Sequence, residues 1–429
     1  MLEGDIPIYT AMADKGEIYN SSFQRIFSLN TTDIAMNKIQ SKIEKMGKID
    51  YQRQIALINH SFMGCKIETD VSIGTDTRFD ISSAFNKVNL EKRYFCAKTI
   101  AELCSDRGIK QTRNNKNEIM WIGMRGFGKD FYSITPVGLS LYQGNCGVSL
   151  FYSALYTKTK QMKYREMERQ AFLPVLNYLK LEKYEDIEGI GAFTGFTSYI
   201  YTLLHLYKYN VDTNIDSRTF NAILNKSISY IQDKILLENN MDFLSGLAGV
   251  LGVCLNMYHA GENENEVKKK VWELIVEIAE TLVAGVKAVD NSCVTWCENG
   301  DIGYAHGNAG IIAQLARYYD ITHDIKVKRI IDMALNYERK YHFNPEKKIW
   351  TFRHNVHYFS WCNGIAGLLL EKVILLKCGW DDPLLYKELS LLIEQLKGTG
   401  FGTDISICHG DIGSIQILKF ASVFLNACE

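Results

Sequence analysis

The chain has 429 residues, of which 47% are hydrophobic and 23% charged, enough to bury a large core and unlike a disordered or fibrous protein. Its 48 basic and 49 acidic residues nearly cancel, and no basic stretch has interleaved aromatic residues, so we expect no nucleic-acid partner. The opening residues lack the features of a signal peptide, and the longest apolar run, Phe243–Met257, is too short for a transmembrane segment. We therefore expect a cytoplasmic protein whose eleven cysteines are reduced thiols or metal ligands.

The first 115 residues are predicted to form a helical N-terminal extension or cap. This region is richer in polar residues than the rest, and its helical segments are expected near Asn37–Phe62 and Leu90–Asp106. The stretch Thr69–Ser83 is expected to be a loop. A second domain is predicted to occupy residues 116–429, where a repeated motif organises the chain.

A small-residue motif recurs six times from about residue 140 to the C-terminus, and an apolar segment of helical length follows each copy. The second copy is degenerate, with Ser198 in place of its second glycine. Successive first glycines lie 46 to 61 residues apart, which is room for two helices and two loops per unit. The copies read LYQGNCGVSLFY, GAFTGFTSYIY, DFLSGLAGVLGV, YAHGNAGIIAQL, WCNGIAGLLLEK and ICHGDIGSIQIL, and their first glycines are Gly144, Gly195, Gly246, Gly307, Gly364 and Gly410.

The two helices of each unit are expected to have different surroundings. The segment before the fifth motif is amphipathic, since its apolar residues follow the i, i+3, i+4, i+7 pattern from Val327 to Leu335. The segments after the motifs are apolar around most of their circumference, as in helices surrounded by protein. This alternation predicts an all-α fold, an α/α toroid of about seven helical hairpins, with the seventh near residues 90–130.

Aligning the copies on their first glycine predicts a metal site. Cys362 and Cys408 both lie two residues before that glycine, and His306, Asn363 and His409 share the next position. Because neighbouring inner helices of a toroid begin side by side, Cys362 and the pair Cys408 and His409 are expected to converge. Two cysteines and one histidine suit zinc and leave one tetrahedral position open, as in catalytic zinc sites. We predict one Zn²⁺ per chain.

His306 and Asp242 are expected on the same rim, where they could move protons. Each has a structural alternative, since His306 could be hydrogen-bonded within a tight loop and Asp242 could cap the helix after Gly246. Cys293 and Cys297 could form a second metal pair, although ordinary loop residues are favoured. Loop or substrate-channel roles remain open for His354 and His357.

The ordered motifs LYQGNCG, GAFTG, DFLSGLAG, GYAHGNAG, SWCNG and ICHG resemble those of the lanthionine synthetase C-like (LanC-like) cyclases. The likeness runs from about residue 115 to the end and is closest to the C-terminal cyclase domain of class II lanthipeptide synthetases. It implies a seven-unit toroid with zinc held by Cys362, Cys408 and His409, and acid–base roles for Asp242 and His306. The implied reaction adds cysteine thiolates to dehydroalanine or dehydrobutyrine and forms lanthionine or methyllanthionine.

One residue departs from that family pattern. The family has His or Tyr after the first zinc cysteine, whereas this chain has Asn363, which cannot act as an acid at neutral pH. The resemblance further implies that the partner is a dehydrated precursor peptide with its leader. A class II synthetase also has an N-terminal dehydratase domain that uses ATP, and no phosphate-binding loop is found here, so the sequence is either a cyclase domain of a longer chain or a free-standing cyclase. The closer resemblance to the class II domain favours the longer chain.

Two alternative functions remain open from the sequence. A LanC-like scaffold could bind thiols or glutathione without cyclase turnover. A toroidal glycosidase could use carboxylates such as Asp242, Asp404 and Asp411, but this alternative leaves the aligned cysteines unexplained.

Overall fold

The structure is a computed structural model with two compact units, Met1–Ser72 with Ile122–Thr135 and Ile73–Trp121 with Pro136–Glu429. His354, His357, Asp404 and the predicted loop Thr69–Ser83 lie outside the residues that it describes. The described residues are 9–12, 14–28, 35–48, 50–52, 54–55, 57–58, 90–113, 116–126, 132–181, 184, 189–209, 215–259, 265–298, 300–352, 358–402 and 405–428.

The N-terminal region contains strands as well as the predicted helices. Strands β1 (Thr10–Met12), β2 (Glu17–Tyr19) and β3 (Arg25–Ser28) form an antiparallel sheet, and helix α1 (Ala35–Lys45) follows. The residues 50–52, 54–55 and 57–58 are also helical. We did not predict these strands from the sequence, because segments of three or four residues are too short to show the alternation of a strand. Strands β6 (Ile122–Gly126) and β7 (Tyr132–Pro136) also pair.

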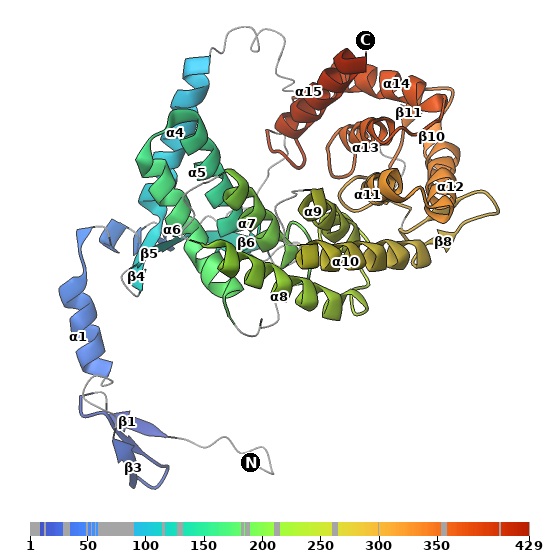
Figure 1. Ribbon diagram of the computed structural model, residues 1–429. Helices are drawn as coiled ribbons and strands as arrows, with labels where there is room; N and C mark the ends of the chain where they lie inside the picture. The colour runs from blue at the N-terminus through green and yellow to red at the C-terminus, as the bar shows by residue number, and fades with distance from the viewer. Residues whose placement is uncertain are drawn as a thin grey trace. The chain divides into compact units, whose positions relative to one another are not determined.

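The larger unit is the predicted α/α toroid. Each motif glycine precedes one helix of an inner set, and successive inner helices contact one another. In Figure 1, α9, α11 and α13 lie on the inner side of α10, α12 and α14. The inner set is α5 (Asn145–Thr159), α7 (Thr197–Tyr209), α9 (Leu247–His259), α11 (Asn308–Thr322), α13 (Ile365–Lys377) and α15 (Asp411–Cys428). The outer set is α4 (Leu90–Arg107), α6 (Met162–Leu179), α8 (Ser217–Ile235), α10 (Asn265–Ala284), α12 (Ile325–Tyr341) and α14 (Leu384–Thr399).

The region expected to hold a seventh unit has one described helix, α4. The Tyr152 hydroxyl of α5 donates a hydrogen bond to the Ala101 carbonyl of α4 and joins the two helices. It is followed by a hairpin of β4 (Ile109–Arg113) and β5 (Lys116–Met120). Two further hairpins have strands of two residues each. They pair β8 (Lys287–Ala288) with β9 (Val294–Thr295) and β10 (Phe343–Asn344) with β11 (Ile349–Trp350). None of the helices among the described residues is long and apolar enough to cross a membrane.

The burial of the helices matches their sequence patterns. Inner helix α9 buries every residue from Leu247 to Leu255, whereas outer helix α10 buries one stripe that recurs every three or four residues. Val327, Ile331 and Leu335 of α12 are buried, as their spacing predicts. The core therefore lies between the two rings.

Backbone hydrogen bonds join the motif loops to one another at one end of the toroid. In each bond, the N–H group of the residue two positions before a first glycine donates to the carbonyl of the corresponding residue in the next motif. We call this set the motif-end ladder. Its pairs are Tyr142–Phe193, Phe193–Leu244, Leu244–Ala305, Ala305–Cys362 and Cys362–Cys408, with N···O distances between 3.0 and 3.3 Å.

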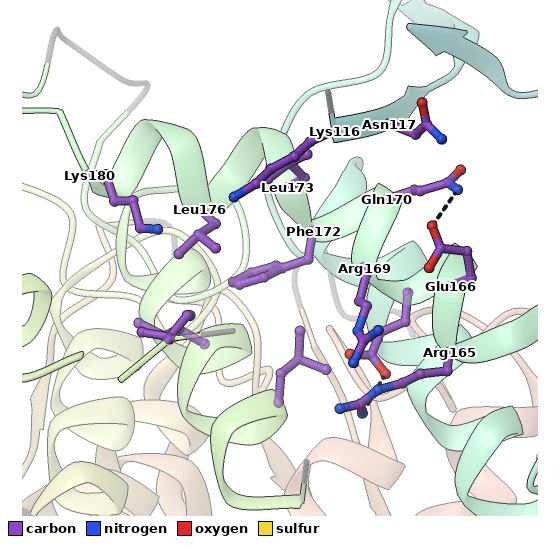
Figure 2. A pocket seen from close by; sticks show the side chains of 14 residues that line it. Lys116, Asn117, Arg165, Glu166, Arg169, Gln170, Phe172, Leu173, Leu176 and Lys180 are labelled. Carbon is purple, nitrogen blue, oxygen red and sulfur yellow. Dashed lines mark hydrogen bonds and ion pairs between the residues drawn. The ribbon is translucent and has the colours of Figure 1, made fainter. Parts of the chain in front are cut away.

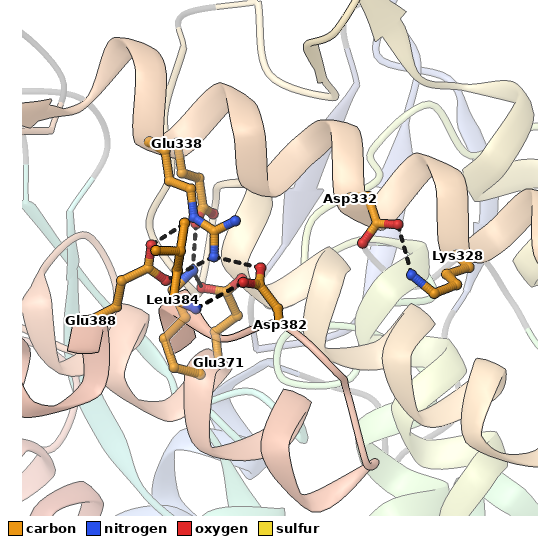
Figure 3. A network of polar contacts seen from close by, with 9 residues as sticks. Lys328, Asp332, Glu338, Glu371, Asp382, Leu384 and Glu388 are labelled. Atoms are coloured by element: carbon orange, nitrogen blue, oxygen red, sulfur yellow. Dashed lines mark hydrogen bonds and ion pairs between the residues drawn. The ribbon is translucent and has the colours of Figure 1, made fainter. Parts of the chain in front are cut away.

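A fully buried ion cluster joins α12 to α13 (Figure 3). The Lys372 ammonium lies 2.7 Å from the Glu338 carboxylate and 2.8 Å from that of Glu371. Burial and then the nearby Glu338 charge raise the pKa of Glu371 well above its ordinary value. The Lys372 ammonium thus lies between two buried carboxyl groups, and its contact with Glu338 is the shorter one.

We predict that Lys372→Met lowers the free energy of unfolding by about 3–5 kcal/mol, because it leaves a buried carboxylate without its cation. The matched control is Lys328→Met, which removes an ion pair with Asp332 on the solvated side of α12. That change should cost about 0–1 kcal/mol. Urea denaturation followed by circular dichroism measures both, and equal losses would contradict a structural role for the cluster.

Candidate metal centre

The structure brings the three predicted ligand residues together. One ligand atom each from Cys362, Cys408 and His409 lies within 4.8 Å of the others, the one group of this kind found among the described residues. Cys362 precedes α13, and Cys408 and His409 precede α15. The ladder bond from the Cys362 amide to the Cys408 carbonyl places the two loops side by side.

Serine hydroxyls hold both ligand loops in place. The Ser360 hydroxyl lies 3.4 Å from the Cys362 Sγ atom and accepts a hydrogen bond from the Asn363 amide. The Ser406 hydroxyl accepts one from the His409 amide at 3.1 Å. Each serine lies four residues before its first glycine, so the repeat supplies the support as well as the ligands.

The contact between Cys362 and Cys408 shifts the pKa values of the two thiols in opposite directions. A hydrogen bond from Cys362, followed by one from Tyr142, lowers the pKa of Cys408 to about 6. The same contact with Cys408, followed by burial, raises the pKa of Cys362. Two cysteine sulfur atoms and one imidazole form a soft donor set that fits zinc and leaves a fourth tetrahedral position open.

Asp242 and His306 form a side-chain pair on the loops of two neighbouring motifs. The His306 Nδ1 atom lies 2.8 Å from the Asp242 Oδ2 atom, and the imidazole is 46% exposed. The other carboxylate oxygen of Asp242 accepts hydrogen bonds from the amides of Ser245 and Gly246 at 2.7 and 2.9 Å. Asp242 thus caps its loop with one oxygen and orients a histidine with the other. This hydrogen bond raises the pKa of His306 and outweighs the opposing effect of burial.

Tyr142 was not recognised from the sequence as a residue of the site, and Cys297 was expected to be an ordinary loop residue. The Tyr142 hydroxyl, from the first motif, hydrogen bonds to Cys408 in the last motif. Tyr142 shares the register of the two cysteines, which is the signal that could have identified it. The Cys297 thiol donates to the His306 carbonyl at 3.3 Å. Cys293 is buried in the core and joins no metal group found in the described part of the chain, so a second metal pair gains no support.

A cavity of about 1030 Å³ runs along the inside of the toroid from the metal end. Tyr142, Ile407 and Cys408 line it at that end, and His259 and Lys377 line it at the far ends of the inner helices. Its wall between them is aromatic, formed by Phe193, Phe243, Tyr304 and Trp361. A separate cleft of about 330 Å³ is lined by Asp242, His306, Asp301 and Cys297, among others.

A further pocket of about 300 Å³ lies among β5, α6 and α7 (Figure 2). Lys116 and Lys180 lie at its edge, and Phe172 and Leu176 form part of its apolar wall. None of the five site residues predicted from the sequence lines it. The chemistry of the thiols therefore belongs to the large cavity and not to this pocket.

Residues 135–427 match the family model described as "Lanthionine synthetase C-like protein". The match covers more than half of the chain, and the protein belongs to this family. A solved structure, "Nisin cyclase", superposes with a TM-score of 0.55 at 18% identity, over 77% of this chain and 82% of that one. At this identity the likeness supports the toroidal fold alone. No curated protein matches the chain in sequence.

We predict that Asp242→Asn lowers the pKa of His306, because the amide keeps an oxygen for the Ser245 and Gly246 amides but loses the charge that favours the imidazolium. Titration of the histidine ring protons by NMR measures this pKa. His342, whose pKa burial lowers, is the internal control and should not change. An unchanged His306 titration would contradict the pairing seen here.

Proposed function

We propose that the protein is a zinc-dependent lanthionine-forming cyclase that acts on a dehydrated precursor peptide. The observation that carries this proposal is the convergence of Cys362, Cys408 and His409 at one end of a cavity of about 1030 Å³. The paired Asp242 and His306 lie on loops of the same ladder. Membership of the lanthionine synthetase C-like family supports the proposal.

The three donors would hold zinc, and the bound ion would lower the pKa of a substrate cysteine thiol. The ladder bond fixes the separation of the two cysteine loops before any ligand arrives. The cavity wall of Phe193, Phe243 and Trp361 excludes water from one side of the site and offers apolar contacts to a peptide.

The proposed reaction adds the substrate sulfur to the β-carbon of dehydroalanine or dehydrobutyrine. The S–Cβ bond forms as the π bond between Cα and Cβ opens, and the electron pair moves to an enolate. The thiol proton passes to water, and the α-carbon takes a proton, so the addition is balanced. His306 is suited to give that proton from Nε2, because Asp242 holds Nδ1 and favours the charged ring.

Asn363 takes no acid role in this scheme. The side-chain oxygen of Asn363 is buried without a hydrogen-bond partner, and the backbone N–H group of Asn363 donates to the Ser360 hydroxyl. Tyr142 supplies a hydroxyl at Cys408 from the opposite end of the repeat. It is suited to positioning this thiolate by donating a hydrogen bond to it.

The alternative functions differ from a cyclase in measurable ways. A thiol- or glutathione-binding scaffold would retain the metal and bind thiols without forming a thioether. A glycosidase gains no support, since Asp411 accepts the Gly402 amide with both oxygens and Asp242 is paired with His306. The precursor peptide, its leader and a dehydratase domain in a longer chain of class II type remain part of the proposal.

We predict about one zinc per chain in the purified protein, measured by inductively coupled plasma mass spectrometry. Cys362→Ala, Cys408→Ala and His409→Ala should each lose the metal and remain folded, because apolar helix packing forms the core. Cys297→Ala, which removes a thiol outside the ligand group, should retain zinc. Full metal content in any of the three ligand variants would refute the ligand assignment.

We predict that His306→Asn slows thioether formation by about 100-fold or more while zinc content stays the same, because a general acid is lost. Mass spectrometry after thiol alkylation counts the unreacted cysteines of a dehydrated model peptide. Asn225→Ala, a change on α8 outside the site, is the control and should keep the wild-type rate. Unchanged turnover in His306→Asn would show that another group protonates the α-carbon. If the zinc-loaded wild type forms no thioether, the thiol- or glutathione-binding scaffold is favoured instead.

A further inference from the structure

Arg317 of inner helix α11 places a positive charge in the wall of the large cavity. Its guanidinium donates from Nη1 to the Gln314 Oε1 atom and from Nη2 to the Asn256 Oδ1 atom, both at 2.8 Å. Both acceptors are neutral amides. Burial lowers the pKa of Arg317, and no ion pair between this arginine and a carboxylate is found in the described part of the chain. A cation is thus partly desolvated without a countercharge, which is unfavourable in the free protein.

Gln314, one of the two acceptors of Arg317, is itself held in place. Gln314 is only 2% exposed, and its Nε2 group donates to the Tyr304 hydroxyl at 3.2 Å. Gly252 on α9 lies so close that a Cβ atom there would be 2.8 Å from the Gln314 Oε1 atom. The buried Gln314 therefore orients the guanidinium, and the exposed Asn256 provides a second acceptor. It has five N–H donors, and the two bonds to Gln314 and Asn256 leave others for a ligand.

The other charged groups of the cavity do not neutralise Arg317. Asp320 lies one turn further along α11, and Lys377 lines the same end from α13. If His259 is neutral, the charged residues that line the cavity are two cations, Arg317 and Lys377, and one anion, Asp320. The wall between this end and the thiols is aromatic, so an anion that enters would find Arg317 as its most buried cationic partner.

We propose that Arg317 binds a carboxylate of the substrate peptide inside the toroid. This inference rests on the proposed function, because it assumes that a peptide with a reactive cysteine occupies the cavity. A planar guanidinium with a fixed fork matches a carboxylate in a two-point hydrogen-bonded pair. The site thus selects peptides that carry an acidic side chain or a C-terminal carboxylate at a set distance from the cysteine.

The helix geometry gives that distance. Arg317 lies about nine residues into α11, which at about 1.5 Å per residue is about 14 Å from the motif end. Its side chain reaches back toward Gln314 and shortens the gap to about 10–14 Å. An extended chain covers about 3.3 Å per residue, so the carboxylate is expected about three or four residues from the cysteine.

The test measures binding of synthetic peptides to the zinc-loaded full chain by isothermal titration calorimetry. The first peptide is acetylated and amidated and carries one cysteine and a glutamate about four residues away, in either chain direction. The second has glutamine in place of glutamate. The third has glutamine and a free C-terminal carboxylate at the same distance, which distinguishes a side-chain from a terminal carboxylate. We expect one of the carboxylate peptides to bind about 10- to 100-fold tighter than the neutral one.

The preference should fall to within about twofold in Arg317→Gln and to an intermediate value in Arg317→Lys, which keeps the charge but loses the fork. Lys377→Gln is the matched control, since it removes another cation from the same cavity, and it should keep the preference. Equal affinities in the wild type, an unchanged preference in Arg317→Gln, or an equal loss in Lys377→Gln would each overturn the proposal. If Arg317→Gln does not fold, the preference of Arg317→Lys tests the proposal instead, and an unchanged preference in that variant would overturn it. Absence of zinc or of thioether product would instead contradict the proposed function.

Discussion

The motif-end ladder is the interaction on which the candidate metal centre depends. Each of its bonds joins equivalent positions of consecutive motifs, so residues that share a register in the sequence become neighbours in space. Cys362 and Cys408 meet for this reason. The close approach requires small residues, and at Gly303 a Cβ atom would lie 2.3 Å from the Cys362 carbonyl oxygen. A side chain there would push apart the loops that hold the ligands.

The same repeat explains how the pair of Asp242 and His306 arises near the three candidate ligand residues. Four residues before the first glycine, Ser360 and Ser406 accept one amide from their own loops. In the third motif this position is Asp242, which performs the same capping with Oδ1 and has a second oxygen left over. His306 of the next motif contacts that second oxygen. The change from a serine hydroxyl to a carboxylate at this position thus keeps the loop contact and supplies a second oxygen that contacts His306.

The fold and the ligand group could be predicted because both follow from periodicity. The alternation of one-sided and fully apolar helices gives the two rings, and the shared register gives Cys362, Cys408 and His409. The contact of Tyr142 with Cys408 could not be predicted in the same way, because it joins the first motif to the last and depends on closure of the ring. The strands β1 to β5 were missed because short hairpins show little alternation. The network of Arg317 depends on side chains about two to three helical turns into α9 and α11. No repeat register marks these positions.

Lys372 and Arg317 are two cations in different layers of the toroid. The first has carboxyl partners within the fold, and the second is proposed to find its partner in a ligand. Lys372 lies between the rings with Glu338 and Glu371, so its charge is neutralised within the fold. Arg317 lies on the cavity side of the inner ring, where it donates hydrogen bonds to two amide oxygens. Neutral dipoles can orient a guanidinium but do not cancel its charge, so its electrostatic stabilisation stays incomplete until an anion arrives. A protein that needed this cation for folding alone would gain more from a carboxylate at position 256 or 314 than from the amides that it has.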